Sequence, residues 1–515
     1  MATFTRETYV LADVNGRMGG MQRAVAAVPL VLIPALGSVQ GGFQPDTWVW
    51  AGAIAAWACA LAVVVTADAG ALRTAWPWAA ASGALLLWTL ASAIWSVHAA
   101  QSVLEARRTL LYAAVVLALT MLARRDASRF LVPTTHAAIS LLLVYALARY
   151  LLGARHYDEF ELYVLNQPFG YANAVGIVAA LGILLSLGLV AASMQTELRA
   201  AAAATVPLLA AALVFSQSTA SYLALAIGVA VMVLLSPAVF RVLAAGAIVA
   251  PAVAVAAAFA FYSRRADMAQ PRLSGAVLVL LLLACAGLAA VAVARIRLPD
   301  TQAHSRTIRR VVLTAVVVLA LGGGAAVARS GASEPRVSYF HVAWHEQVLQ
   351  HPLLGTGAGT FGHYWQQSGK LLDFGGALDA HSLYLETLAE LGPLGLLLLA
   401  AMLLAPLRGV IRHRFAPHVP AAAGAYAAFL VHAGLDWDWE MPAVVVAGLC
   451  CAAAVATAEL RPGPPLGRAA RGALLAVSAV LGACAIAGAR SHTVPAAAPE
   501  TERAPRSGTL SQTRA

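Results

Sequence analysis

The sequence has little charge: Asp, Glu, Lys and Arg together make up only 11% of its 515 residues. Hydrophobic residues make up 61%, and the mean hydropathy is +0.76. A soluble domain cannot bury so much apolar surface. Uncharged runs such as 273–294 and 311–328 are long enough to cross about 30 Å of hydrocarbon as helices. The composition therefore predicts an all-α polytopic membrane protein.

Cysteine is also scarce, and its positions exclude two kinds of site. All five cysteines lie inside apolar runs: Cys59, Cys285, Cys450, Cys451 and Cys484. An exposed disulfide framework and a thiolate metal site are both excluded by this placement. The histidines do not form the HExxH pattern of a zinc protease, because the next histidine after Glu346 is His351. We expect no metal and no cofactor.

The apolar runs predict about 14 or 15 transmembrane helices, at about 20 apolar residues for each crossing. These helices are expected within residues 24–328 and 384–489, on either side of a polar segment at residues 329–383. Residues 1–23 form a cytoplasmic N-terminal segment. Residues 490–515 form a tail rich in Ala, Pro, Thr and Arg that we expect to be disordered.

Basic residues cluster in alternate connections, which explains the net charge of +10 better than nucleic-acid binding does. The basic connections at 124–129, 295–310 and 408–414 all fall on the cytoplasmic side if the N-terminus is inside, as the positive-inside rule requires. We therefore expect a multi-pass membrane protein whose outward face carries the polar residues that could do chemistry. The outward segments are then 96–108, 153–170, 263–272, 329–383 and 435–440.

The polar segment 329–383 contains a predicted short amphipathic helix at 338–350, which Pro352 ends. A glycine-rich turn follows, with glycines at Gly355, Gly357 and Gly359. A dinucleotide fingerprint would need a preceding strand, which is not expected here. Two interpretations stay open: the glycines let backbone N–H groups cradle a phosphate, or the turn docks the segment on the helix bundle.

His381 stands where this segment meets the next apolar run. A partly hydrated imidazole at that junction can act as a general base, and the alternative is a capping or packing histidine. Glu386 and Glu390 follow on one helical face. Glu390 projects nearly opposite to His381, at about 100° per residue. A structural role, such as binding a backbone amide, is therefore the better interpretation for both glutamates.

Three arginines and one acidic turn complete the candidates. Arg336, Arg107 and Arg108 lie in outward segments, where a guanidinium can bind phosphate oxygens in a bidentate manner. The alternatives are lipid-headgroup contact and a role in topology. Asp436, Asp438 and Glu440 form a turn with two tryptophans. Such a turn can hold an ion or donor hydroxyl groups, but a solvated hairpin is the default interpretation.

Together these motifs resemble the O-antigen ligase and polymerase superfamily of bacterial membrane glycosyltransferases. The order His-[Asn/Ser]-x-x-Leu-x4-Glu-x-Gly-x-x-Gly of that family matches His381, Ser382, Leu385, Glu390, Gly392 and Gly395. Arg336 with the His-Pro-Leu-Leu-Gly-x-Gly-x-Gly-x-Phe run resembles its large loop. Trp95-Ser96, Gly170-Tyr171-x-Asn173 and the acidic turn are also similar. The resemblance extends from about Ser92 to Pro442.

The resemblance implies inverting, metal-independent transfer of a glycan from undecaprenyl pyrophosphate to an acceptor hydroxyl. It implies that His381 is the general base and that Arg336 supplies a positive charge for catalysis. Substrate contacts are implied for these residues: Arg107, Arg108, Gly355, Gly357, Gly359, Asn173, Ser218, Glu390, Asp436 and Asp438. The Ser-Arg-Gly motif of the family is replaced by Ser216-Gln-Ser218. Either Arg107 and Arg108 or Arg264 and Arg265 then supply that charge, or the donor is handled differently.

The implied partners are the lipid-linked donor, a lipid or glycan acceptor, and membrane lipids, with no nucleic acid. A polymerase of the same superfamily is one alternative to a ligase. A transporter or flippase is an alternative of another class. Transporters usually place ionisable residues at the membrane midplane and often contain internal repeats, whereas here the polar residues lie in outward segments.

Overall fold

The computed structural model is helical throughout the residues that it describes, without a β-strand among them. The described residues are 20–65, 70–123, 127–153, 164–263, 271–299, 306–315, 318, 334–369, 377–413, 415–458, 464 and 466–487. The expected disordered tail and most of the N-terminal segment lie outside these ranges, as does most of the predicted span 311–328.

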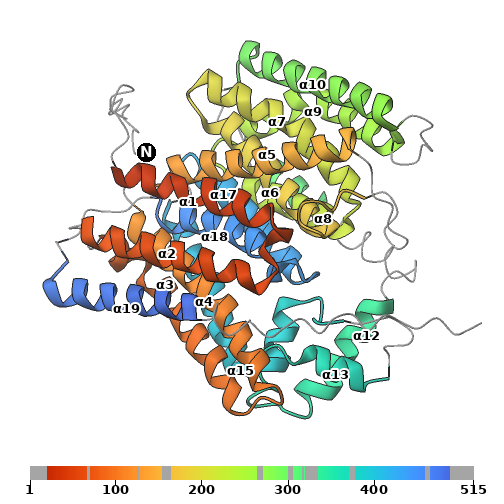
Figure 1. The fold of residues 1–515 in the computed structure, drawn as a ribbon. Helices are drawn as coiled ribbons and strands as arrows, with labels where there is room; N and C mark the ends of the chain where they lie inside the picture. Colours follow the sequence, from red (N-terminus) through yellow and green to blue (C-terminus); the bar gives the residue numbers. More distant parts are fainter. Residues whose placement is uncertain are drawn as a thin grey trace, which may run out of the picture.

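The first half of the chain forms eight helices, numbered as in Figure 1. They are α1 (Gly20–Gly37), α2 (Pro45–Val65), α3 (Gly70–Ala91), α4 (Ala99–Leu122), α5 (Ser128–Leu152), α6 (Ala172–Ala192), α7 (Thr196–Ser216) and α8 (Thr219–Leu235). The apolar stretch from Thr196 to Leu235 forms two separate helices, α7 and α8. Gln217 divides them in a left-handed conformation, with φ of 56°.

The second half contributes the remaining described helices, among them the short helices of the polar segment. They are α9 (Val239–Ser263), α10 (Pro271–Arg295), α12 (Glu334–Val342), α13 (Phe361–Gln367), α15 (Leu383–Leu404), α16 (Arg408–His413), α17 (Val419–Ala433), α18 (Pro442–Ala456) and α19 (Arg468–Ala487). A π-helical turn, Ala343–Val348, continues α12. The amphipathic helix expected at 338–350 therefore begins earlier, at Glu334.

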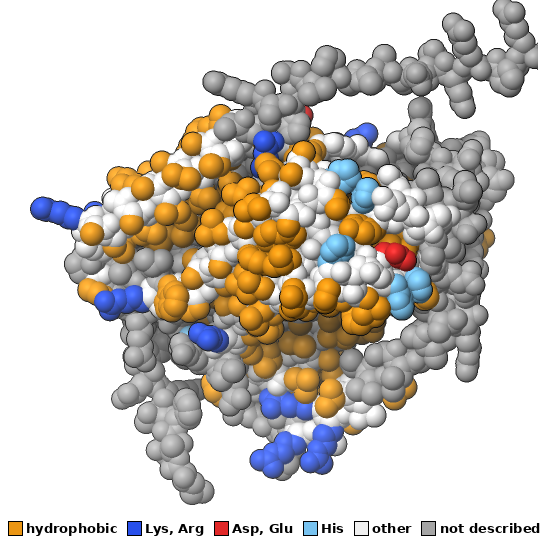
Figure 2. All heavy atoms as spheres, turned by 90° about the horizontal axis from the view of Figure 1, so that it is seen from below, with side chains coloured by type: hydrophobic (Ala, Val, Ile, Leu, Met, Phe, Trp, Pro, Cys, Tyr) orange, Lys and Arg blue, Asp and Glu red, His pale blue; other side chains and the backbone are white. Residues whose placement is uncertain are grey.

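Among the described residues, nine helices are long and apolar enough to cross a membrane, and four shorter apolar helices accompany them. Large hydrophobic side chains such as Leu87 (67% exposed) and Leu397 (64% exposed) point outward, where lipid can solvate them. Figure 2 shows one such face, with a hydrophobic centre and with histidine side chains gathered toward one end. The protein is therefore a polytopic all-α membrane protein, as the composition predicts.

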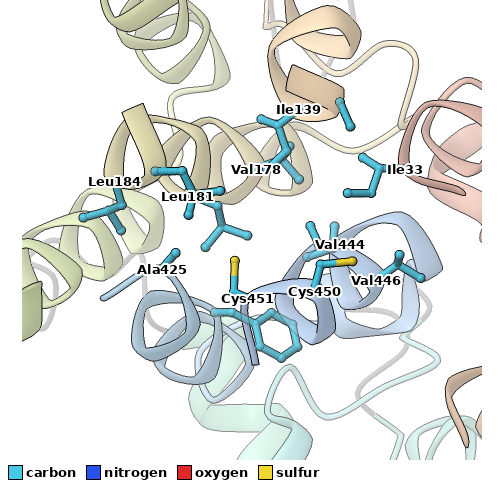
Figure 3. Close-up of a cluster of buried hydrophobic side chains, with 14 of the residues drawn as sticks. Ile33, Ile139, Val178, Leu181, Leu184, Ala425, Val444, Val446, Cys450 and Cys451 are labelled. Carbon is cyan, nitrogen blue, oxygen red and sulfur yellow. The ribbon is translucent and has the colours of Figure 1, made fainter. Parts of the chain in front are cut away.

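The core lies where α6 packs against its neighbours. Figure 3 shows Val178 and Leu181 of α6 beside Ile139 of α5, with Cys450 and Cys451 of α18 facing them. Small residues allow the close approach of helices that membrane packing needs. At Gly188 of α6, an added Cβ would lie 2.1 Å from the Cβ of Ala421 in α17. Both cysteines are buried among apolar side chains, as their positions in the sequence indicate.

Arginines hold together the helix ends at one end of the bundle. Arg199 donates to the carbonyl of Val293, Arg241 to Ala191 and Arg309 to Ser236. The ends of α6, α8 and α10 therefore meet on one side, together with basic connections that the charge pattern assigns to the cytoplasm. In Figure 1, α12 and α13 lie on the right, whereas the chain enters α1 on the left.

Candidate functional site

Segments distant in the sequence meet beside α12 and α13. Hydrogen bonds join Ser102 of α4 to Ala358 of the glycine-rich turn, at 2.8 Å, and Tyr171 before α6 to Asp436 before α18, at 2.5 Å. Another joins Ser221 of α8 to His432 of α17, at 3.0 Å. Three of the outward segments expected from the charge pattern, 96–108, 329–383 and 435–440, are thus represented at this one end of the bundle.

His381 has a strained backbone and a defined environment. Its φ of +52° lies in the left-handed region, which a residue other than glycine seldom adopts and which is common at functional sites. The extended backbone of Ser382 then starts α15. The imidazole stacks on the ring of Tyr339, with centroids 4.6 Å apart. Its Nδ1 lies 2.8 Å from a carboxylate oxygen of Asp379, at ion-pair distance, which directs Nε2 away from Asp379.

The pKa of His381 is raised by its acidic surroundings. Burial lowers the pKa of this imidazole, but the contact with Asp379 and the negative charges of Asp379 and Asp436 outweigh burial. The positive charge of Arg336 opposes these carboxylates. A raised pKa makes the neutral imidazole a stronger base, and the Asp379 carboxylate stabilises the imidazolium that forms when it takes a proton.

Arg336 is held by a buried carboxylate. One terminal nitrogen of the guanidinium lies 3.3 Å from Oδ2 of Asp436, whose side chain is fully buried. Asn173 donates to the same oxygen at 2.5 Å, and Tyr171 donates to Oδ1. Burial, followed by the nearby Asp436, raises the pKa of Tyr171 well above its ordinary value, so that the phenol stays a donor. The side chain of Arg336 itself is 37% exposed, which leaves it accessible to a ligand.

The acidic turn at residues 436–440 is buried, so the default interpretation of a solvated hairpin is wrong. Asp436 is 0%, Asp438 1% and Glu440 9% exposed. Each carboxylate instead reaches a different partner, which compensates its burial. Asp438 lies 3.1 Å from Nδ1 of His432, whose Nε2 lies 3.0 Å from the hydroxyl of Ser221.

Ser218 belongs to the same buried chain of hydrogen bonds. Its hydroxyl lies 2.7 Å from that of Ser221 and accepts the backbone N–H of Ser221, which caps the start of α8. Burial raises the pKa of Asp438, with His432 acting in the opposite direction. The substrate contacts predicted for Asp436, Asp438 and Ser218 stay predictions. In this structure, these side chains form hydrogen bonds or ion pairs with other protein groups.

Arg108 is a buried cation between two carboxylates. It forms ion pairs with Glu105, one turn before it on α4, and with Glu440, at 2.9 Å. Its guanidinium also lies over the rings of Trp48 and Trp439, at 5.6 and 5.1 Å from their centroids. Burial raises the pKa of Glu440 to about 7, against the opposing effect of Arg108. These contacts indicate a structural role for Arg108. Its neighbour Arg107 is only half-buried.

The glycine-rich turn is docked on α15 and α4. The Glu390 carboxylate accepts the N–H of Gly359 at 2.7 Å and of Phe361 at 2.9 Å. Its backbone carbonyl accepts the N–H of Gly357, while the N–H of Gly355 donates to His351. These amides therefore already have acceptors, and the geometry favours the docking interpretation over a phosphate cradle. The structural role expected for Glu390 is confirmed by the same hydrogen bonds.

Two glycines are required for this docking. Gly357 has a φ of +99°, and a Cβ there would lie 2.3 Å from the side chain of Ser96. Gly392 has a φ of +66° inside α15, and a Cβ there would lie 2.4 Å from the carbonyl of Leu353. The Glu390 carboxylate therefore binds the turn, and two residues later Gly392 kinks α15 so that the turn can approach the helix.

Residues 203–400 match the family model described as O-antigen ligase. This match supports membership of the chain in the O-antigen ligase superfamily. The matched region contains Arg336, the glycine-rich turn, His381 and Glu390, whereas Arg108 and the acidic turn lie outside it. No curated protein in the comparison matches the chain. The match supports a ligase- or polymerase-type function in polysaccharide assembly.

Two cavities adjoin the site. One, of about 510 Å³, is lined by polar side chains of α4 and α13 together with apolar side chains such as Phe43, Trp48 and Leu378. The other, of about 100 Å³, continues between apolar side chains of α3, α15 and α18. Glu105, Arg108 and Glu386 line both. No group of three or more metal-ligating side chains that could hold an ion lies among the described residues.

The structure gives three site residues partners that the sequence reasoning did not name. Asp379 contacts His381, Glu105 contacts Arg108, and His432 contacts Asp438. Asp379 stands two residues before His381, which is a usable local signal. Glu105 stands three residues before Arg108 on a helix, which is the spacing of an ion pair. His432 gives no comparable signal, because a histidine inside an apolar helix is more often a packing residue.

Proposed function

We propose that the protein transfers a glycan from an undecaprenyl-pyrophosphate carrier to a hydroxyl of an acceptor in cell-surface polysaccharide assembly. The observation that carries the proposal is the His381–Asp379 pair, with Arg336 held by Asp436 within electrostatic reach of the same imidazole. A base beside an accessible guanidinium suits the attack of a hydroxyl on a carbon whose leaving group is a pyrophosphate.

The reaction needs one proton transfer and one displacement. Nε2 of His381 takes the acceptor hydroxyl proton while the oxygen bonds to the anomeric carbon of the donor glycan. The bond from that carbon to the pyrophosphate oxygen breaks, and its electron pair leaves with the lipid carrier. Attack from the face opposite the leaving group inverts the anomeric centre. Arg336 balances the charge that develops on the departing pyrophosphate, and no metal takes part.

The site is proposed to face the extracytoplasmic side of the inner membrane. This orientation rests on the charge pattern of the sequence, which assigns the basic connections to the cytoplasmic side. A cysteine in place of Gln367, the exposed last residue of α13, should react with a membrane-impermeant thiol reagent in intact cells. One in place of Ser330, outside the described residues, should react likewise. Reaction only after the cells are permeabilised would overturn the orientation.

The test of the chemistry is transfer by purified protein from a lipid-pyrophosphate donor. Replacing His381 by alanine should lower the rate on the order of 10²–10⁴-fold, which is typical for removal of a general base. The variant His381→Asn tolerates the left-handed backbone better and should be equally impaired. The matched control is His345→Ala, because His345 is an exposed histidine of the same polar segment. Near-normal turnover by folded His381→Asn would refute the assignment.

A further inference from the structure

The polar cavity of about 510 Å³ has the composition of a carbohydrate site. Phe43 and Trp48 supply aromatic rings that can pack against the apolar face of a sugar ring. Gln101 and Gln366 supply amides that can both donate and accept hydrogen bonds. Aromatic surface with a few convergent polar groups is the usual character of a small-molecule site.

The charge of this cavity selects among possible ligands. Three carboxyl groups line it, those of Glu105, Glu386 and Glu440, together with the guanidinium of Arg108 and the imidazoles of His98 and His363. Two of the three carboxyl groups already pair with Arg108, so its charge is not available to an anion. A phosphate or pyrophosphate would therefore find no free guanidinium here, whereas hydroxyl groups and amines would find acceptors.

The cavity also adjoins the proposed base. Glu386 lines it and accepts the backbone N–H of Ala380 at 2.6 Å, and Ala380 immediately precedes His381. Arg336, the arginine assigned to the pyrophosphate, does not line this cavity. The cavity and the arginine assigned to the pyrophosphate are therefore separate places near His381.

We propose that this cavity binds the acceptor through a neutral or amine-bearing sugar without phosphate. The inference rests on the proposed transfer reaction, because it assigns one of the two substrates of that reaction to a place. It excludes recognition of a phosphorylated acceptor sugar at this cavity, and it separates acceptor binding from the arginine that faces the donor.

The test uses the purified full chain and saturation-transfer difference NMR with glucose, glucosamine and glucose 6-phosphate. Glucose or glucosamine should receive saturation, and glucose 6-phosphate should receive much less. The double variant Gln101→Ala/Gln366→Ala should weaken sugar binding about tenfold or more, since it removes two neutral hydrogen-bonding groups. The control is Gln350→Ala, an exposed glutamine of the same segment outside the cavity.

The outcomes separate the cavity from the reaction. Preferential binding of glucose 6-phosphate would overturn the inference. An affinity for sugar that is the same in the double glutamine variant as in the natural protein would also overturn it. In the transfer assay, the double variant should raise the KM for the acceptor and leave the KM for the lipid-pyrophosphate donor unchanged. An increase in donor KM alone would overturn the inference. Sugar binding in a protein that performs no transfer would overturn the proposed function and leave the sugar site intact.

Discussion

Arg108 offers the sharpest test, because a role in binding substrate and a role in structure predict opposite results. Replacing it by methionine keeps most of the side-chain length but removes the charge. Glu105 and Glu440, whose side chains are 13% and 11% exposed, would then lack their cation. Breaking a buried ion pair by removing one partner costs about 3–5 kcal/mol. We expect Arg108→Met to lower the free energy of unfolding by about that amount.

The loss should depend on pH, because a carboxyl without its cation can protonate instead. The pKa of Glu440 is already raised to about 7 by burial, and without Arg108 it rises further. A carboxyl whose pKa is raised in the folded state binds a proton there more readily than in the unfolded state. Stability therefore falls as the pH rises. The destabilisation should be larger at pH 8 than at pH 6.

Unfolding of purified protein in detergent, at both pH values, measures this difference. The double variant Arg108→Met/Glu440→Gln should recover part of the loss, because a buried pair removed on both sides leaves a smaller uncompensated charge. Arg107→Met, at the next and half-buried position, is the matched control. If Arg108→Met were as stable as the natural protein but had a raised donor KM, Arg108 would bind substrate and the structural role would be refuted.

Two further predictions concern the base and the arginine beside it. Arg336→Lys should lose most transfer activity, because an ammonium group cannot reproduce bidentate contact with phosphate, and full activity would leave Arg336 only a positioning role. In Asp379→Asn, the carboxylate contact that raises the pKa of His381 is lost, and burial then lowers it. The acid limb of the pH dependence of kcat/KM should move to lower pH as the maximal rate falls. An unmoved limb would show that Asp379 does not act on His381.

Hydropathy predicted the membrane helices well, but it misplaced the start of α4. The sequence predicted an outward segment at 96–108 and a span from 109, whereas the helix begins at Ala99. Glu105 and Arg108 lower the hydropathy of its first turns. The structure neutralises both charges by pairing them with each other and with Glu440, which lies more than 300 residues away. A local average cannot anticipate such a partner.

The same limit applies to the candidate site. The junction of loop and helix made His381 a candidate base, which stays a prediction, and the helical spacing of Glu390 predicted a structural role such as binding a backbone amide. The acidic turn was taken as solvated because three carboxylates in five residues are costly to bury. Its burial depends on partners from α4, α12 and α17, and nothing within the turn itself indicates which side chains those helices present.

These partners explain how a residue of a long polar segment can be held for chemistry. Asp436 fixes Arg336, Asp438 contacts His432, and Glu440 contacts Arg108. Because consecutive carboxylates of one short turn bind three different helices, a shift of any one helix would leave a buried charge without its partner. The position of Arg336 is thereby tied to the membrane helices rather than to the loop that carries it. Catalytic geometry demands such rigidity, because a misplacement of about 1 Å can cost on the order of 100-fold in rate.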